Sequence, residues 1–312
     1  MNITKIIRQA FNSRLKEIDL YASQAGEIQH RVMTRLVNQA ANTEWGKKYD
    51  YKSIRNYEEF KSRIPVQTYD EIKPYVERLR AGEQNLLWPS EIRWFAKSSG
   101  TTNDKSKFLP VSKEALQDIH YRGGKDAAAL YFRINPDSHF FSGKGLILGG
   151  SHSPNLNSNH SLVGDLSAIL IQNVSPLINL IRVPSKKIAL MSEWETKIEA
   201  IANSTIPVNV TNLSGVPSWM LVLIKRILEK TGKQTTQEKY QITVEKKILF
   251  LMSFLFFQNK IRISSPKPQH QKYSTNTTGR ISKLHLSIFF QSNKLYKQKR
   301  CQKSNTFRYT KE

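Results

Sequence analysis

The sequence predicts an α/β domain with a partly parallel sheet over residues 1–234, followed by a basic tail over residues 235–312. In the first part, apolar segments of strand length alternate with amphipathic segments of helix length, as in α/β folds. Glycines mark its turns, and 13 of the 14 glycines in the chain precede residue 235. The second part has one glycine, Gly279, and three acidic residues, which is an unusual composition for a folded α/β segment. We therefore place the boundary near Thr235.

The N-terminal segment is expected to form helices. Apolar residues recur at helical spacing over residues 6–15 and again over residues 28–40. This pattern predicts two amphipathic helices with a break near Gly26. Residues 43–51 are mainly polar, and we expect a turn there.

Two further helices and a hairpin follow in the prediction. Residues 57–63 look helical, and helical spacing returns from Tyr69, with Gly82 as the expected stop. Residues 92–96 and 108–111 are short and apolar, which is typical of strands. Because a hydroxyl-rich turn joins these two segments, we expect them to pair as a hairpin.

The second half alternates between helices and strands. A helix is expected from Ser112 to Leu130, and a buried strand over residues 145–150, which ends in a glycine turn. Residues 198–201 belong to a predicted helix and residues 208–213 to a predicted strand. A final helix is expected from Ser218.

The loop over residues 98–107 carries the clearest chemical signal. Its hydroxyl side chains can donate to phosphate oxygens, its glycine lets the backbone approach a ligand, and its lysines can balance phosphate charge. It lacks the spacing of a Walker A loop. On composition alone, a solvated polar hairpin tip is the more common structure for such a segment. The nucleotide-binding residues predicted on the functional interpretation are Ser98, Ser99, Gly100, Thr101, Thr102 and Lys107.

These residues, with Phe108, Leu109 and Pro110 after them, resemble the phosphate-loop motif of the GH3 family. This family comprises acyl-acid amido synthetases of the adenylate-forming superfamily. Other segments are also similar to this family. Four segments before the loop look like the bacterial members: residues 43–46, 57–60, 64–66 and 69–75. Residues 213–219, after the loop, also resemble the family. The resemblance covers about residues 1–234.

The resemblance implies an incomplete N-terminal domain of the adenylate-forming fold. It also implies a two-step ligase: ATP and a carboxylic acid give an acyl-adenylate and pyrophosphate, and the amine of an amino acid then attacks the acyl carbon. ATP and Mg²⁺ are the implied cofactors. A small carboxylic acid and an amino acid are the implied partners. The resemblance assigns no catalytic residue and no protein ligand for a metal ion.

The sequence also departs from the family pattern. We find neither the aromatic-x-Ser/Ala-Ser-Glu segment that contacts nucleotide and metal nor the Tyr-Arg-x-Gly-Asp-like segment that binds the ribose within residues 213–312. Asp104 stands where the family commonly has Gly. We therefore expect a truncated or frameshifted product with weak or no activity. Residues 235–312 would then be a poorly ordered tail.

The charge of the chain leaves one alternative function open. The net charge is +23, from 48 Lys and Arg against 25 Asp and Glu. Residues 1–234 hold 32 basic and 22 acidic residues, whereas residues 235–312 hold 16 and three. A basic tail can bind the phosphates of nucleic acid. We prefer a solvated tail and do not expect a nucleic-acid partner.

The remaining features indicate a cytoplasmic protein without a membrane anchor. The first 14 residues lack the apolar run of a secretory signal. Residues 248–257 are apolar but span about half of the roughly 20 residues that a membrane helix needs. Cys301 is the single cysteine, which excludes an internal disulfide. His152 could touch a substrate, but we expect polar surface. The oligomeric state does not follow from the sequence.

Overall fold

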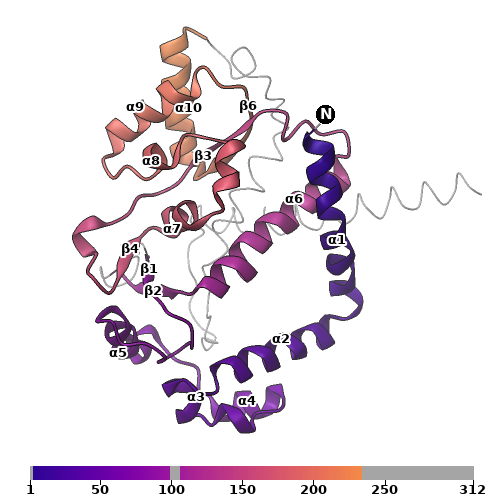
Figure 1. The fold of residues 1–312 in the computed structure, drawn as a ribbon, viewed down its shortest axis with the longest axis vertical. Coiled ribbons are helices and arrows are strands. Elements are labelled where there is room, and N and C mark those ends of the chain that lie inside the picture. Colours follow the sequence, from indigo (N-terminus) through magenta and orange to yellow (C-terminus); the bar gives the residue numbers. More distant parts are fainter. Residues whose placement is uncertain (1–2, 99–105, 234–312) are drawn as a thin grey trace, which may run out of the picture. The chain divides into compact units, whose positions relative to one another are not determined.

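The computed structural model describes residues 3–98 and 106–233 of the chain. The predicted tail and residues 99–105 of the predicted phosphate loop lie outside these described residues, so the predictions for them stay predictions. Within the described residues, helices alternate with strands along the chain (Figure 1). The strands form two three-stranded sheets. The predicted α/β class is confirmed.

Helices form the first part of the described chain. They are α1 (Ile3–Ser23), α2 (Ala25–Ala40), α3 (Glu44–Lys48), the 3-10 helix η1 (Tyr51–Ser53), α4 (Tyr57–Arg63) and α5 (Tyr69–Arg80). The two N-terminal helices match the prediction, with the break at Gln24 rather than at Gly26. The predicted turn over residues 43–51 is wrong. Thr43 caps a helix there, because its hydroxyl accepts a hydrogen bond from the Gly46 amide at 2.9 Å.

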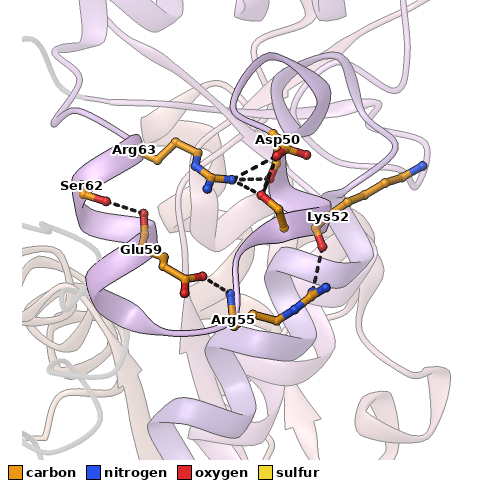
Figure 2. Close-up of polar contacts among 7 residues, drawn as sticks. Asp50, Lys52, Arg55, Glu59, Ser62 and Arg63 are labelled. Carbon is orange, nitrogen blue, oxygen red and sulfur yellow. Dashed lines mark hydrogen bonds and ion pairs between the residues drawn. The ribbon is translucent and has the colours of Figure 1, made fainter.

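The connection between α3 and α4 is held by the polar cluster that Figure 2 shows. Asp50 has a φ of +45°, a left-handed conformation that Asp tolerates better than most residues, and its carboxylate accepts a hydrogen bond from the Ser53 hydroxyl at 2.5 Å. Arg63 at the end of α4 donates to the Asp50 carbonyl oxygen at 2.7 Å. At the start of α4, the Arg55 amide donates to the Glu59 carboxylate at 2.6 Å. Both ends of this two-turn helix are therefore fixed by side chains.

Helix α5 begins with a capping box and ends before a glycine. The Thr68 hydroxyl accepts from the Glu71 amide, and the Glu71 carboxylate accepts from the Thr68 amide. Gly82 has a φ of +105°, which confirms it as the stop. Arg78 joins α5 to α3, because its guanidinium donates to both oxygens of the Glu44 carboxylate, at 2.8 and 2.6 Å.

The first sheet has the strand order β2-β1-β4. Its strands are β1 (Trp94–Lys97), β2 (Phe108–Val111) and β4 (Leu162–Gly164). Strand β1 lies in the middle, antiparallel to β2 with Lys97 opposite Phe108, and parallel to β4 with Ala96 opposite Gly164. The predicted hairpin is confirmed, and the parallel pairing with β4 confirms a partly parallel sheet.

The second sheet is parallel throughout its described strands, in the order β5-β3-β6. These strands are β3 (Lys144–Leu148), β5 (Arg182–Val183) and β6 (Val210–Gly215). The helix predicted after β2 starts as a π-helix and continues as a regular helix. The helices from β2 onward are η2 (Ala115–Tyr121), α6 (Arg122–Ile134), η3 (Pro154–Leu156), α7 (Leu166–Asn173), η4 (Pro176–Leu180), α8 (Lys186–Ala189), α9 (Trp194–Thr205) and α10 (Pro217–Thr231).

Each sheet has its own apolar core. Leu146 and Val183 of the second sheet pack with Ile201 of α9 and Leu223 of α10. The first sheet is buried on both faces of β1, because Phe95 and its neighbour Ala96 belong to two different clusters. Among the helices that the structure describes, none is both long and apolar enough to cross a membrane.

We predict that Phe95→Ala lowers the free energy of unfolding by about 3–5 kcal/mol, because the ring is fully buried and its removal leaves a cavity. Leu109→Ala on the neighbouring strand is the matched control, since Leu109 is 44% exposed. It should cost about 1 kcal/mol or less. Urea unfolding followed by circular dichroism measures both. Equal losses for the two variants would contradict the central place of Phe95.

Candidate functional site

The base of the predicted phosphate loop is closed by two hydrogen bonds. The Ser98 amide donates to the Lys107 carbonyl oxygen at 2.9 Å, which continues the ladder between β1 and β2. The Lys107 amide donates to the Ser98 hydroxyl oxygen at 3.1 Å. By accepting this bond, the hydroxyl keeps its own proton available for an anion. The two residues that flank the loop are therefore held together across it.

Two of the six predicted site residues lie in the described part of the chain. Ser98 is half-buried and Lys107 is exposed. The other four predicted residues lie outside the described residues, as does Asp104. Those four are Ser99, Gly100, Thr101 and Thr102.

The turn after β3, at Gly150 and Ser151, is bonded to residues at the same edge of the first sheet as Ser98. Because β1 and β4 are parallel, their carboxyl ends meet, and Asp165 follows β4 as Ser98 follows β1. The Asp165 carboxylate accepts a hydrogen bond from the Ser151 amide at 3.1 Å. The Ser167 hydroxyl accepts one from the Gly150 amide at 2.8 Å. These bonds hold the turn that follows β3 against the start of α7.

Gly150 is required at this turn. A Cβ atom there would lie 2.0 Å from the Asp165 carboxylate oxygen, well inside contact distance. Any other residue would push Asp165 away from the turn. The glycine turn expected after the strand over residues 145–150 is thus present, and close packing is its physical reason.

Lys197 of α9 is the buried cation of this region, with 2% of its surface exposed. Its ammonium donates to the carbonyl oxygens of Gly149 and Gly150, at 2.9 and 2.8 Å. Burial lowers the pKa of Lys197 to about 8, and the nearby Asp165 carboxylate opposes that shift. An uncharged amine retains two N–H groups, so both carbonyl bonds can persist after deprotonation.

His152 follows this turn and lies against the first sheet. Its ring is 5.0 Å from the ring of Trp94, and its backbone forms a bridge with Gly164. The Nε2 atom is buried without a hydrogen-bond partner in the described part of the chain. Burial lowers the pKa of His152. His152 is thus partly buried, because Trp94 of β1 contacts its ring, and whether it touches a substrate stays a prediction.

The donor set at the loop fits a polyphosphate. Hydroxyls, backbone amides and an ammonium group are the usual partners of phosphate oxygens, and the described residues flanking the loop supply one hydroxyl and one ammonium. The described residues contain no group of three or more His, Cys, Asp or Glu side chains that could hold a metal ion.

Sequence reasoning missed Asp165 and Lys197. Asp165 directly precedes α7, a position typical of a helix N-cap, so its place could have been suspected. Nothing in the sequence links Lys197 to Gly149, because 48 residues separate them and the contact depends on how α9 packs on the second sheet.

We predict that the stability of the chain rises with pH through the titration of Lys197. Above pH 8 the folded state releases this proton while the unfolded state, with a pKa near 10.5, still binds it. The contribution between pH 7 and pH 9.5 is about 2 kcal/mol. Lys197→Met should remove that rise, and Lys187→Met, at an exposed position, should keep it. Urea unfolding at both pH values measures the difference. A Lys197→Met variant with the wild-type pH dependence would refute the assignment.

The chain is similar to known proteins of one family. Residues 14–243 match the model of the GH3 family N-terminal domain. The chain is 31% identical over 103 residues to indole-3-acetic acid-amido synthetase GH3.2 of Arabidopsis thaliana, which is 33% of this chain and 19% of that protein. It is 27% identical over 104 residues to jasmonoyl-L-amino acid synthetase JAR4 of Nicotiana attenuata, again 33% of this chain and 18% of the relative. The matched segments thus span less than a fifth of these relatives.

Solved structures agree on the fold. The GH3.15 acyl acid amido synthetase superposes with a TM-score of 0.57 at 22% identity, over 69% of this chain and 38% of that one. The same kind of enzyme in complex with 2,4-DB gives a TM-score of 0.58 at 22% identity, over 72% and 38%. The predicted partial adenylate-forming fold is confirmed for the described residues, while the expected bacterial character stays a prediction. With its family model matched over most of its length, the chain belongs to the GH3 family.

Proposed function

We propose that this chain binds ATP at the loop over residues 98–107 for the activation of a carboxylic acid. The closed loop base between Ser98 and Lys107 is the observation that carries this proposal. Family membership supports it, since the relatives are named as synthetases that join an acid to an amino acid. The proposed nucleotide-binding residues are Ser98, Ser99, Gly100, Thr101, Thr102 and Lys107.

The proposed chemistry has two steps. Carboxylate oxygen attacks the α-phosphorus of ATP, and pyrophosphate leaves with the electron pair of the broken P–O bond. The amine of an amino acid then attacks the acyl carbon, AMP leaves with the electron pair of the broken C–O bond, and the nitrogen releases a proton to solvent. Activation is needed because a carboxylate oxygen is itself a poor leaving group. The protein contributes mainly by holding the phosphates and placing the reacting atoms.

Within this proposal, residues 1–234 form the nucleotide-binding part and residues 235–312 a separate basic segment. Mg²⁺ would neutralise phosphate charge, and the reaction would take place in the cytoplasm. The family motifs for ribose and metal are absent from residues 213–312. We therefore propose that this chain alone binds the nucleotide but supports little or no amide formation.

We predict that Lys107→Ala raises the dissociation constant for MgATP about tenfold, the effect of losing one charge-assisted contact to phosphate. Lys61→Ala removes an exposed lysine of α4 and is the matched control, with no expected change. Isothermal titration calorimetry on the full chain measures both. Unchanged affinity in Lys107→Ala would argue against this loop as the nucleotide site.

A separate measurement tests the reaction. ATP–pyrophosphate exchange with a panel of carboxylic acids should stay near background for the full chain, whereas a non-hydrolysable acyl-adenylate analogue should bind in competition with ATP. Exchange clearly above background would show that the missing motifs are not needed here. Failure of both ATP and the analogue to bind would reject the proposed function.

A further inference from the structure

Strand β2 is an edge strand, and its first residue has two outward backbone groups. In an antiparallel pair, residues alternate between facing the partner strand and facing away from it. The Lys107 carbonyl oxygen accepts from the Ser98 amide, so the backbone of Lys107 faces the β1 side. The amide and carbonyl of the next residue, Phe108, therefore point away from β1. With the order β2-β1-β4, the described sheet has no strand on that side. These two groups need other partners.

The hydroxyl of Tyr69 supplies both partners. The Phe108 amide donates to the Tyr69 hydroxyl oxygen at 2.9 Å, and the same hydroxyl lies 3.4 Å from the Phe108 carbonyl oxygen as its donor. One side chain thus replaces a neighbouring strand at this residue. It is placed by α5, whose first residue it is and whose capping box fixes the start of that helix.

The Tyr69 ring also lies next to the predicted phosphate ligand. The ammonium of Lys107 is 5.3 Å from the centroid of the ring, within the range of a cation–π contact. Such a contact orients an ammonium group while its N–H groups stay free for an anion. A carboxylate in the same place would instead neutralise the charge.

The other end of α5 contacts the same strand residue. The guanidinium carbon of Arg80 lies 4.0 Å from the centroid of the Phe108 ring. Helix α5 therefore holds Phe108 through its backbone and through its side chain. The preceding residue, Lys107, is fixed by both this anchor and the bond to Ser98.

We propose that Tyr69 is a positioning residue for the nucleotide site, a role that rests on the proposed function. Its hydroxyl fixes the strand at Phe108, and its ring directs the Lys107 ammonium toward the phosphates. Tyr69 itself touches no phosphate. Its loss acts through the placement of Lys107.

Two variants separate the hydroxyl from the ring. Tyr69→Phe removes the hydrogen bonds to Phe108 and keeps the ring, whereas Tyr69→Leu removes both. Tyr57→Phe is the control, because Tyr57 is 60% exposed at the start of α4. Amide hydrogen exchange at Phe108, MgATP affinity and thermal melting are measured for each full-length variant.

We expect Phe108 to exchange about tenfold faster in Tyr69→Phe, and the MgATP dissociation constant to rise about threefold to tenfold. Tyr69→Leu should weaken MgATP further, and Tyr57→Phe should match the wild type. In a Lys107→Ala background, Tyr69→Phe should have no additional effect on affinity, because its role passes through that lysine. If Tyr69 were merely structural, its loss would lower the melting temperature, and the effect of Tyr69→Phe on MgATP affinity would not depend on Lys107.

The outcomes that overturn the inference are distinct from those that overturn the function. If the wild type binds MgATP and both Tyr69 variants bind equally well, the positioning role is wrong and the proposed function stands. Equal effects of Tyr69→Phe with and without Lys107 would also reject it. A wild type that does not bind MgATP, with a Phe108 amide that Tyr69 still protects, rejects the function and with it the positioning role.

Discussion

Strand β1 is the constraint on which the candidate site depends, because both its edges and both its faces are occupied. One edge pairs with β2 and the other with β4, while Phe95 and Ala96 enter separate apolar clusters. A strand held on four sides has little freedom to shift its register. Ser98, which follows it directly, therefore starts the loop from a fixed point, and the parallel pairing with β4 brings Asp165 to the same edge.

Elements with side-chain signals at their ends could be predicted from the sequence, and those held by distant partners could not. The bounds of α4 agree with the prediction, and Asn56 caps its start. Strands β4 and β5 are three and two residues long, too short for a recognisable alternation, and exist because a parallel neighbour pairs with them. The π-helix before α6 has the same apolar spacing as a regular helix over so few residues, so periodicity could not separate the two.

The candidate site also has a part that could be predicted from the sequence and a part that could not. The loop over residues 98–107 could be found because hydroxyls, a glycine and lysines gather in one segment. Its supports could not be found, since Tyr69 lies 39 residues before Phe108 and is joined to it by the packing of α5. Lys197 is hidden in a similar manner: its helix shows an ordinary amphipathic pattern, and its burial follows from the turn after β3. Chemistry carried by one segment is readable from sequence, whereas positioning is a tertiary property.

Within the described part of the chain, Lys107 differs from Arg78 in how its charge is paired. Arg78 donates to the carboxylate of Glu44 and also pairs with Glu83, so its charge is already balanced. Among the described residues, Lys107 contacts the aromatic ring of Tyr69, which attracts a cation without cancelling its charge. The described residues therefore leave the charge of this ammonium available to an incoming polyanion. The net charge of +23 is a poor guide to such a site, because phosphate binding depends on where single cations are placed rather than on the sum over the chain.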